Sequence, residues 1–208
     1  MELNHSKKQV AEFYEDFQSR GKYDYFYGDE KRKNLYTQLI GKGNKILEVG
    51  CRSGNLTQFY HEGNQVVGID VDRNALIEFE KRLNLKSHWV DVDSEDLPFD
   101  DEMFDVVVFS EVMEHLRFPR KALSEISRVL MKHGRLIGSV PNAFRLRNRW
   151  KFLCGKPFES DPSHLRSYSA SILRVELEKK FTEVKIHPVS GHLLGGGRAG
   201  VPVFRWLP

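Results

Sequence analysis

Short apolar runs alternate with amphipathic segments between residues 45 and 189, and this alternation constrains the fold more than any other feature of the chain. Runs of Val, Ile, Leu and Phe predict strands, and apolar residues at helical spacing predict the helices between them. Strands separated by helices form βαβ units, so we expect an α/β domain with a mainly parallel sheet and helices on both faces. The expected strands are 45–49, 65–70, 86–90, 104–110, 135–140 and 182–189. One expected helix starts at residue 56, and three others span 73–83, 119–130 and 169–180.

The two ends of the chain depart from this pattern. Residues 1–42 contain two stretches with helical spacing, so we expect an N-terminal helical cap before a core domain at 43–189. At the other end Pro202 interrupts the apolar run Val201–Trp206, and proline is unsuited to a central strand. We therefore expect 190–208 to be an irregular C-terminal segment, with the chain either truncated there or ending in a short last strand.

Composition limits the classes of protein to which the chain can belong. The 32 basic and 29 acidic side chains give a net charge of +3, a balance too even to support nucleic-acid binding by itself, although it does not exclude such a partner. No apolar stretch approaches the roughly 18 residues of a membrane span, and the N-terminus lacks the apolar core of a secretory signal. Cys51 and Cys154 are too few for a disulfide framework and suit a reducing compartment. We expect a cytoplasmic protein without a membrane span, and its oligomeric state stays open.

Glycine and polar residues follow the first three expected strands, where open parallel sheets bind their ligands. Gly50 and Gly54 let a ligand approach the main chain closely after the first strand. Asp70 ends the second strand, where a carboxylate can accept hydrogen bonds from both hydroxyls of a ribose. Asp93 and Ser94 follow the third strand and suit the edge of an adenine. Together these residues predict a nucleoside site.

Glu48, at the end of the first strand, distinguishes between two classes of nucleoside cofactor. Nicotinamide enzymes need G-x-G-x-x-G, in which helix amides hold a pyrophosphate, whereas this loop has the spacing G-x-x-x-G. A carboxylate beside the loop repels a pyrophosphate but suits the ammonium of an amino-acid moiety. The loop therefore favours S-adenosylmethionine over NAD and leaves an NAD-dependent oxidoreductase as a remote alternative.

Four motifs, in order from Lys45 to Asn142, resemble class I S-adenosylmethionine-dependent methyltransferases: ILEVGCRSGNLT, VVGIDVD, DSEDLPFDDEMFDVVVFSEVMEHL and RVLMKHGRLIGSVPN. The resemblance implies a Rossmann-like, mostly parallel sheet of the seven-stranded type. It also implies that the cofactor is held by the loop after the first strand and by residues that follow the next three strands, namely Glu48, Gly50, Cys51, Arg52, Gly54, Asp70, Val71, Asp93, Ser94 and Ser110. Arg52 departs from the glycine that the family usually has, and its guanidinium either crowds the loop or pairs with the cofactor carboxylate.

The segment after the fourth strand carries Glu111, Glu114 and His115 in the pattern E-x-x-E-H, near where the methyl group should project. Methyl transfer from a sulfonium requires a positioned acceptor and, for a hydroxyl acceptor, removal of a proton. Histidine titrates near neutral pH, so His115 is the first candidate for a catalytic base and Glu111 is the second.

A metal site is an alternative interpretation of the same residues. With His164, the three side chains could hold a divalent cation such as Mg²⁺ that lowers the pKa of a hydroxyl. The E-x-x-E-H pattern resembles the motif of ubiquinone-pathway O-methyltransferases. Together with the later histidine it also resembles the motif of small-RNA 2′-O-methyltransferases. Both resemblances imply metal-assisted O-methylation. Short acidic–histidine motifs also arise by chance, so we favour the interpretation without a metal.

Residues 141–168 interrupt the passage from the fifth strand to the next helix and are the candidate substrate-cap insertion. Arg145, Arg147, Arg149 and Lys151 alternate with apolar residues there. They suit an acidic or phosphorylated acceptor, or they form only a solvated helix face. The sequence thus predicts a methyltransferase acting at oxygen on a small-molecule or carrier-linked acceptor. The alternative is a non-catalytic, methyltransferase-like regulatory or scaffold subunit that binds the cofactor.

Overall fold

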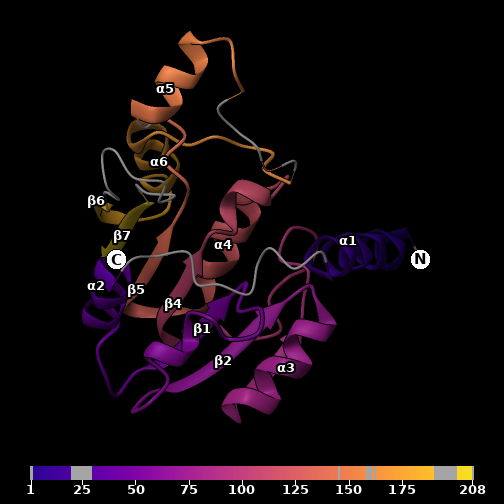
Figure 1. The fold of residues 1–208 in the computed structure, drawn as a ribbon. Helices are drawn as coiled ribbons and strands as arrows, with labels where there is room; N and C mark the ends of the chain where they lie inside the picture. Colours follow the sequence, from indigo (N-terminus) through magenta and orange to yellow (C-terminus); the bar gives the residue numbers. More distant parts are fainter. Residues whose placement is uncertain are drawn as a thin grey trace.

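The structure is a computed structural model that describes residues 2–19, 30–144, 146–157, 161, 163–189 and 201–207. It consists of a central sheet with helices packed against it (Figure 1). The elements in chain order are α1 (Glu2–Ser19), α2 (Glu30–Ile40), β1 (Lys45–Val49), η1 (Thr57–Phe59), β2 (Gln65–Asp70), α3 (Arg73–Leu83), β3 (Lys86–Trp89), β4 (Phe104–Ser110), η2 (Met113–His115), α4 (Pro119–Val129), β5 (Leu130–Ser139), α5 (Leu146–Leu153), α6 (Ala170–Leu177), β6 (Thr182–Val189) and β7 (Val201–Leu207), where η marks a 3₁₀ helix.

The described strands form one sheet in the order β3-β2-β1-β4-β5-β7-β6. Strands β1 to β5 pair in parallel, and β7 is antiparallel to both β5 and β6. This confirms the expected Rossmann-like, mostly parallel sheet. The strand order reverses on the two sides of β1, because β2 lies on one side and β4 on the other. Ligands of such sheets bind beyond the carboxyl ends of the strands at this reversal.

Alternate residues of the central strands face two separate cores, which confirms that helices cover both faces of the sheet. Leu47, Val107 and Leu136 belong to the core that α4 and α6 complete, whereas Ile46 and Val106 belong to the core under α2. Because side chains of a strand alternate between faces, runs of apolar residues are buried on both sides. In β4 this burial is nearly continuous: Phe104, Val106, Val107, Val108 and Phe109 are fully buried.

The C-terminal segment corrects one expectation from the sequence. Val201–Leu207 is not irregular but forms β7, which inserts between β5 and β6. The objection based on Pro202 was wrong, because the pairing with β5 starts only at Val203. Pro202 lies opposite Pro188 of β6, outside the part of β7 that is paired on both sides. A missing N–H is tolerated at such a position.

Two smaller differences concern the start of elements. The helix expected from residue 56 is only the 3₁₀ helix η1 at Thr57–Phe59, and β5 begins at Leu130 rather than at residue 135. The loop after β1 is therefore followed by a single turn, which brings Thr57 and Tyr60 close to the end of that strand. No helix among the described residues is long and apolar enough to cross a membrane.

Candidate functional site

The parallel pairing of β1 with β2 and β4 brings the loops that follow these strands to one edge of the sheet. Val49 is in register with Ile69 of β2 and with Phe109 of β4. The glycine loop at 50–54, the carboxylates at 70–72 and the E-x-x-E-H segment at 111–115 therefore leave the sheet side by side. The sequence-predicted residues come together because of this register.

Gly50 and Gly54 both adopt positive φ, at 76° and 83°. A Cβ atom at Gly50 would lie 2.3 Å from Cγ2 of Val112, and one at Gly54 would lie 2.4 Å from Cδ1 of Leu83. Backbone conformation and space both require glycine at these two positions. The loop is thus packed directly against the start of the E-x-x-E-H segment and against α3.

Asp70 holds the glycine loop in place through its carboxylate. It accepts a hydrogen bond from the backbone N–H of Arg52 at 2.8 Å and another from that of Asp72 at 2.9 Å. The side chain is buried, and this burial raises its pKa. A carboxylate has about four acceptor sites, so two remain for further donors such as ribose hydroxyls. This structural role was not predicted from the sequence.

Arg52 has a φ of 47°, which explains why glycine is usual at this position. The left-handed region costs a residue with a side chain roughly 1–2 kcal/mol. We therefore expect Arg52→Gly to raise the free energy of unfolding by about 0.5–1 kcal/mol, after the added entropy of an unfolded glycine is subtracted. Urea unfolding measures this, with Glu102→Gly as the control because Glu102 has a φ of 52° in an exposed turn. A loss of stability in Arg52→Gly alone would show that its guanidinium stabilises the loop.

Glu48 is buried rather than open to the loop. Its Oε2 accepts hydrogen bonds from the hydroxyl of Thr57 at 2.5 Å and from the hydroxyl of Tyr60. Burial raises the pKa of Glu48 to about 7. Both hydroxyls donate to the same oxygen, so Oε1 remains for the ammonium predicted from the sequence. Cys51, also buried, lies on the far side of the loop against Gly68 and Phe79.

The segment predicted to meet adenine is fixed by contacts within the chain. The carboxylate of Asp93 accepts from Nε of Arg117 at 3.0 Å and from the N–H of Phe118 at 2.7 Å. The hydroxyl of Ser94 donates to Asp91 at 2.6 Å. Asp93 therefore joins the β3 loop to the start of α4, and adenine contacts by Asp93 and Ser94 stay a prediction.

Helix α1 covers this edge, which no motif in the sequence indicated. Nζ of Lys7 donates to the carbonyl oxygen of Trp89 at 2.9 Å and lies 3.8 Å from the centre of the Trp89 ring. Arg73 stacks on the same ring at 3.7 Å, and the indole N–H donates to the carbonyl oxygen of Val71 at 2.7 Å. Trp89 is thus fixed beside the predicted ribose carboxylate. A lysine in the first helix and a tryptophan ending a strand are too common to signal this contact.

Tyr14 of α1 connects the nucleoside side of the edge with the E-x-x-E-H segment. Its ring packs edge-on against His115, with centroids 6.0 Å apart. Burial raises the pKa of Tyr14, and the negative charges of Asp70 and Glu114 raise it further. The glycine loop joins the two halves of the predicted site, because Asp70 accepts from the N–H of Arg52 and Gly50 packs against Val112, the residue after Glu111.

Ser110 and Glu111 belong to a polar network with α2. The hydroxyl of Ser110 accepts from Nη2 of Arg32 at 2.8 Å and from the hydroxyl of Tyr36 at 2.9 Å. Oε1 of Glu111 accepts from the hydroxyl of Ser139 at 2.9 Å and lies 3.5 Å from Nη2 of Arg32. Arg32 is buried, and the charge of Glu111 helps to raise its pKa. The carboxylate of Glu111 is thus directed to Ser139 and Arg32.

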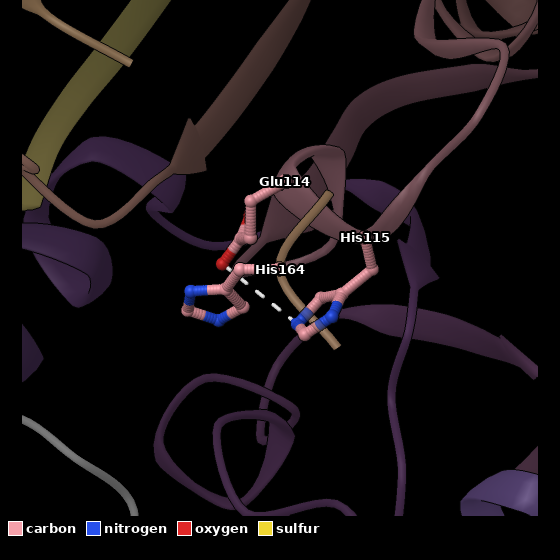
Figure 2. A group of neighbouring side chains, drawn as sticks. All are labelled: Glu114, His115 and His164. Carbon is pink, nitrogen blue, oxygen red and sulfur yellow. Dashed lines mark ion pairs between the residues drawn. The ribbon is translucent and has the colours of Figure 1, made fainter. Parts of the chain in front are cut away.

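Glu114, His115 and His164 form a separate cluster (Figure 2). One ligand atom from each side chain lies within 4.8 Å of the others, and Glu111 is not part of this group. His164 is brought there by the 161–168 segment, because the N–H groups of Leu165 and Arg166 donate to the carbonyl oxygen of Glu114 at 2.9 and 3.1 Å. Of the four sequence candidates, the structure therefore assembles three.

Three comparisons with known proteins agree with this architecture. Residues 47–138 match the family model described as a methyltransferase domain. An uncharacterized protein of Methanocaldococcus jannaschii is 34% identical over 148 residues, covering 65% of this chain and 62% of that protein. A phthiotriol/phenolphthiotriol dimycocerosates methyltransferase of Mycobacterium tuberculosis is 36% identical over 110 residues, covering 49% of this chain and 40% of that protein. The chain thus spans less than two thirds of the length of either relative.

The N-methyltransferase NodS of Bradyrhizobium japonicum, solved with S-adenosylhomocysteine, has the same fold at a TM-score of 0.67 and 20% identity over 89% of each chain. Residues 47–138, less than half of the chain, are thus similar to a methyltransferase domain, and the comparisons support a class I S-adenosylmethionine-dependent methyltransferase. The carboxylates of Asp70 and Glu48 at this edge have the chemistry that a ribose and an ammonium require, and their roles toward the cofactor stay predictions. The narrower resemblance of E-x-x-E-H to metal-assisted O-methyltransferases stays a prediction.

Proposed function

We propose that this methyltransferase transfers a methyl group from S-adenosylmethionine to an oxygen of a small-molecule or carrier-linked acceptor. The observation that carries the proposal is the register of the sheet, which brings the glycine loop and Asp70 to the same edge as the cluster of Glu114, His115 and His164. When bound, the cofactor supplies a methyl group on a sulfonium whose sulfur keeps the bonding electron pair. A hydroxyl acceptor must also lose its proton, and amine or thiol acceptors need such help less.

The cluster is suited to remove that proton. Nδ1 of His115 lies 3.1 Å from the carbonyl oxygen of Ser163. A carbonyl only accepts, so in the neutral ring Nδ1 carries the hydrogen and Nε2 keeps its lone pair. Nε2 lies 4.0 Å from Oε1 of Glu114. This supports the sequence prediction of His115 as the acceptor-side base and removes support from Glu111.

The segment around α5 supports an acceptor with both apolar and acidic parts. Leu146, Trp150 and Leu153 lie at positions i, i+4 and i+7 of α5 and are each at least 68% exposed. Residues 141–157 contain no acidic side chain, and Arg149 and Lys151 lie on the same helix. Arg145 and the side chain of Arg147 lie outside the described part of the chain. In this proposal 1–42 cap the cofactor, 141–168 cap the acceptor, and 43–189 hold both.

Turnover with labelled S-adenosylmethionine and a panel of phenolic, sugar, carrier-linked and RNA acceptors tests the proposal. His115→Ala should lower kcat by at least about 100-fold on a hydroxyl acceptor, which is the usual contribution of proton transfer. Binding of S-adenosylhomocysteine should change less than about threefold, because His115 lies on the acceptor side. His187→Ala, at an exposed position of β6, is the matched control and should be fully active.

Two outcomes would overturn this assignment. Turnover only on nitrogen or sulfur acceptors, with His115→Ala as active as the unmodified protein, would exclude assisted O-methylation. Binding of S-adenosylhomocysteine without turnover on any acceptor would favour the alternative of a non-catalytic regulatory or scaffold subunit.

A further inference from the structure

The carboxylate of Glu114 is buried, and among the described residues no other residue donates a hydrogen bond to it. The residue is 1% exposed, and both Oε1 and Oε2 lie in the interior. Its neighbour in the cluster, Nε2 of His115, is 4.0 Å away, which is too far for a hydrogen bond. A buried carboxylate left in this state costs several kcal/mol, so proteins protonate it, pair it with a cation or use it to ligate a metal. Burial accordingly raises the pKa of Glu114.

The two imidazoles beside Glu114 are arranged as metal ligands usually are. The ring centroids of His115 and His164 are 4.7 Å apart, and Figure 2 shows both rings next to the Glu114 carboxylate. Each ring has an acceptor on another side: the carbonyl oxygen of Ser163 faces His115, and Oδ2 of Asp161 lies 3.9 Å from Nε2 of His164. Outer partners of this kind orient an imidazole so that its other nitrogen faces the metal.

We infer that Glu114, His115 and His164 bind one divalent cation of the zinc class. Two imidazoles and one carboxylate are ligands that Zn²⁺ accepts readily, whereas Mg²⁺ prefers oxygen ligands and keeps several waters. Three protein ligands leave a position open on the ion. The inference rests on the proposed O-methylation but not on His115 as its base, because a metal-bound Nε2 has no lone pair left for a proton. The cation would hold the acceptor hydroxyl at the open position and lower its pKa, so that the proton would pass to water.

Glu111 does not belong to this site, although the E-x-x-E-H resemblance places it there. Its carboxylate is directed to Ser139 and to Arg32, and its backbone has a φ of 55°. Recruiting Glu111 would break its ion pair with the buried guanidinium of Arg32 and its hydrogen bond from the hydroxyl of Ser139. The ligand set is therefore three residues, with one carboxylate and two imidazoles.

Metal titration of the chelator-treated full chain tests the inference. We expect one Zn²⁺ per chain by calorimetry, binding tighter than Mg²⁺, and visible absorption bands of bound Co²⁺ as a second readout. Glu114→Gln and His164→Ala should each weaken Zn²⁺ binding by at least about 100-fold, since loss of an outer partner alone costs about 10–100-fold. Glu111→Gln and His187→Ala should bind as the unmodified chain does. Zn²⁺ should raise the unfolding temperature of the unmodified chain but not of Glu114→Gln.

The isosteric Glu114→Gln variant keeps the result interpretable, because it removes a buried charge and should fold at least as well without metal. The inference is overturned if Zn²⁺ does not bind, if Mg²⁺ binds more tightly, or if Glu111→Gln weakens binding as much as Glu114→Gln does. If the chain binds S-adenosylhomocysteine but not Zn²⁺, only the inferred metal site is contradicted. If it binds Zn²⁺ but not S-adenosylhomocysteine, the proposed methyl transfer is contradicted instead.

Discussion

Replacing Asp70 with alanine is expected to weaken binding of S-adenosylhomocysteine by at least about 100-fold in a calorimetric titration. Two ribose hydroxyls donating to a carboxylate contribute roughly 1.5–3 kcal/mol each, and a tenfold change in affinity corresponds to about 1.4 kcal/mol. The same carboxylate accepts from the N–H groups of Arg52 and Asp72. Its loss therefore also releases the glycine loop and should lower the free energy of unfolding by about 1–3 kcal/mol.

Asp72→Ala is the matched control for this experiment. Asp72 is as buried as Asp70, and its carboxylate also accepts from two backbone N–H groups, those of Asn74 and Ala75. It caps the N-terminus of α3, so its loss should cost about 1 kcal/mol of stability. Binding of S-adenosylhomocysteine should change only a few-fold in this variant. Equal affinity in Asp70→Ala and the unmodified chain would contradict the ribose assignment.

Gly50→Ala is expected to lower the free energy of unfolding by about 3 kcal/mol, the largest stability effect at this site. Alanine at a φ of 76° costs about 1 kcal/mol. The added Cβ would lie 2.3 Å from Cγ2 of Val112, and overpacking of this kind costs about 1–3 kcal/mol more. The displaced loop should also bind S-adenosylhomocysteine more weakly.

Gly43→Ala separates the backbone cost from the contact. Gly43 has a φ of 78°, and a Cβ there would have nothing within 4 Å. Its replacement should cost only about 1 kcal/mol, and the double variant Gly50→Ala/Val112→Ala should recover most of the difference from Gly50→Ala. Denaturant unfolding measures all three. Equal losses in Gly43→Ala and Gly50→Ala would show that Val112 moves aside without cost.

Much of the architecture was predictable because it follows from local patterns of apolar residues. The apolar runs that became β1, β2 and β4 have the bounds expected from the sequence, since burial on both faces requires continuous Val, Ile, Leu and Phe. Gly50, Gly54 and Asp70 were identified because strand-end loops of parallel sheets bind ligands and because their spacing matches a family pattern. The strand β7 was left open as one of two alternatives, since its pairing with β5 and β6 depends on contacts far along the chain.

The sequence by itself therefore determined the sheet and the similarity to a methyltransferase domain. Only the tertiary structure decided what each polar side chain contacts. Glu111 and Glu114 are three residues apart, yet one is turned to Arg32 of α2 and the other to His164 beyond α5. Glu48 is bound by Thr57 and Tyr60, and Asp93 by Arg117. A carboxylate can meet any donor that the fold brings near, so its partner follows from packing over long sequence separations and not from spacing.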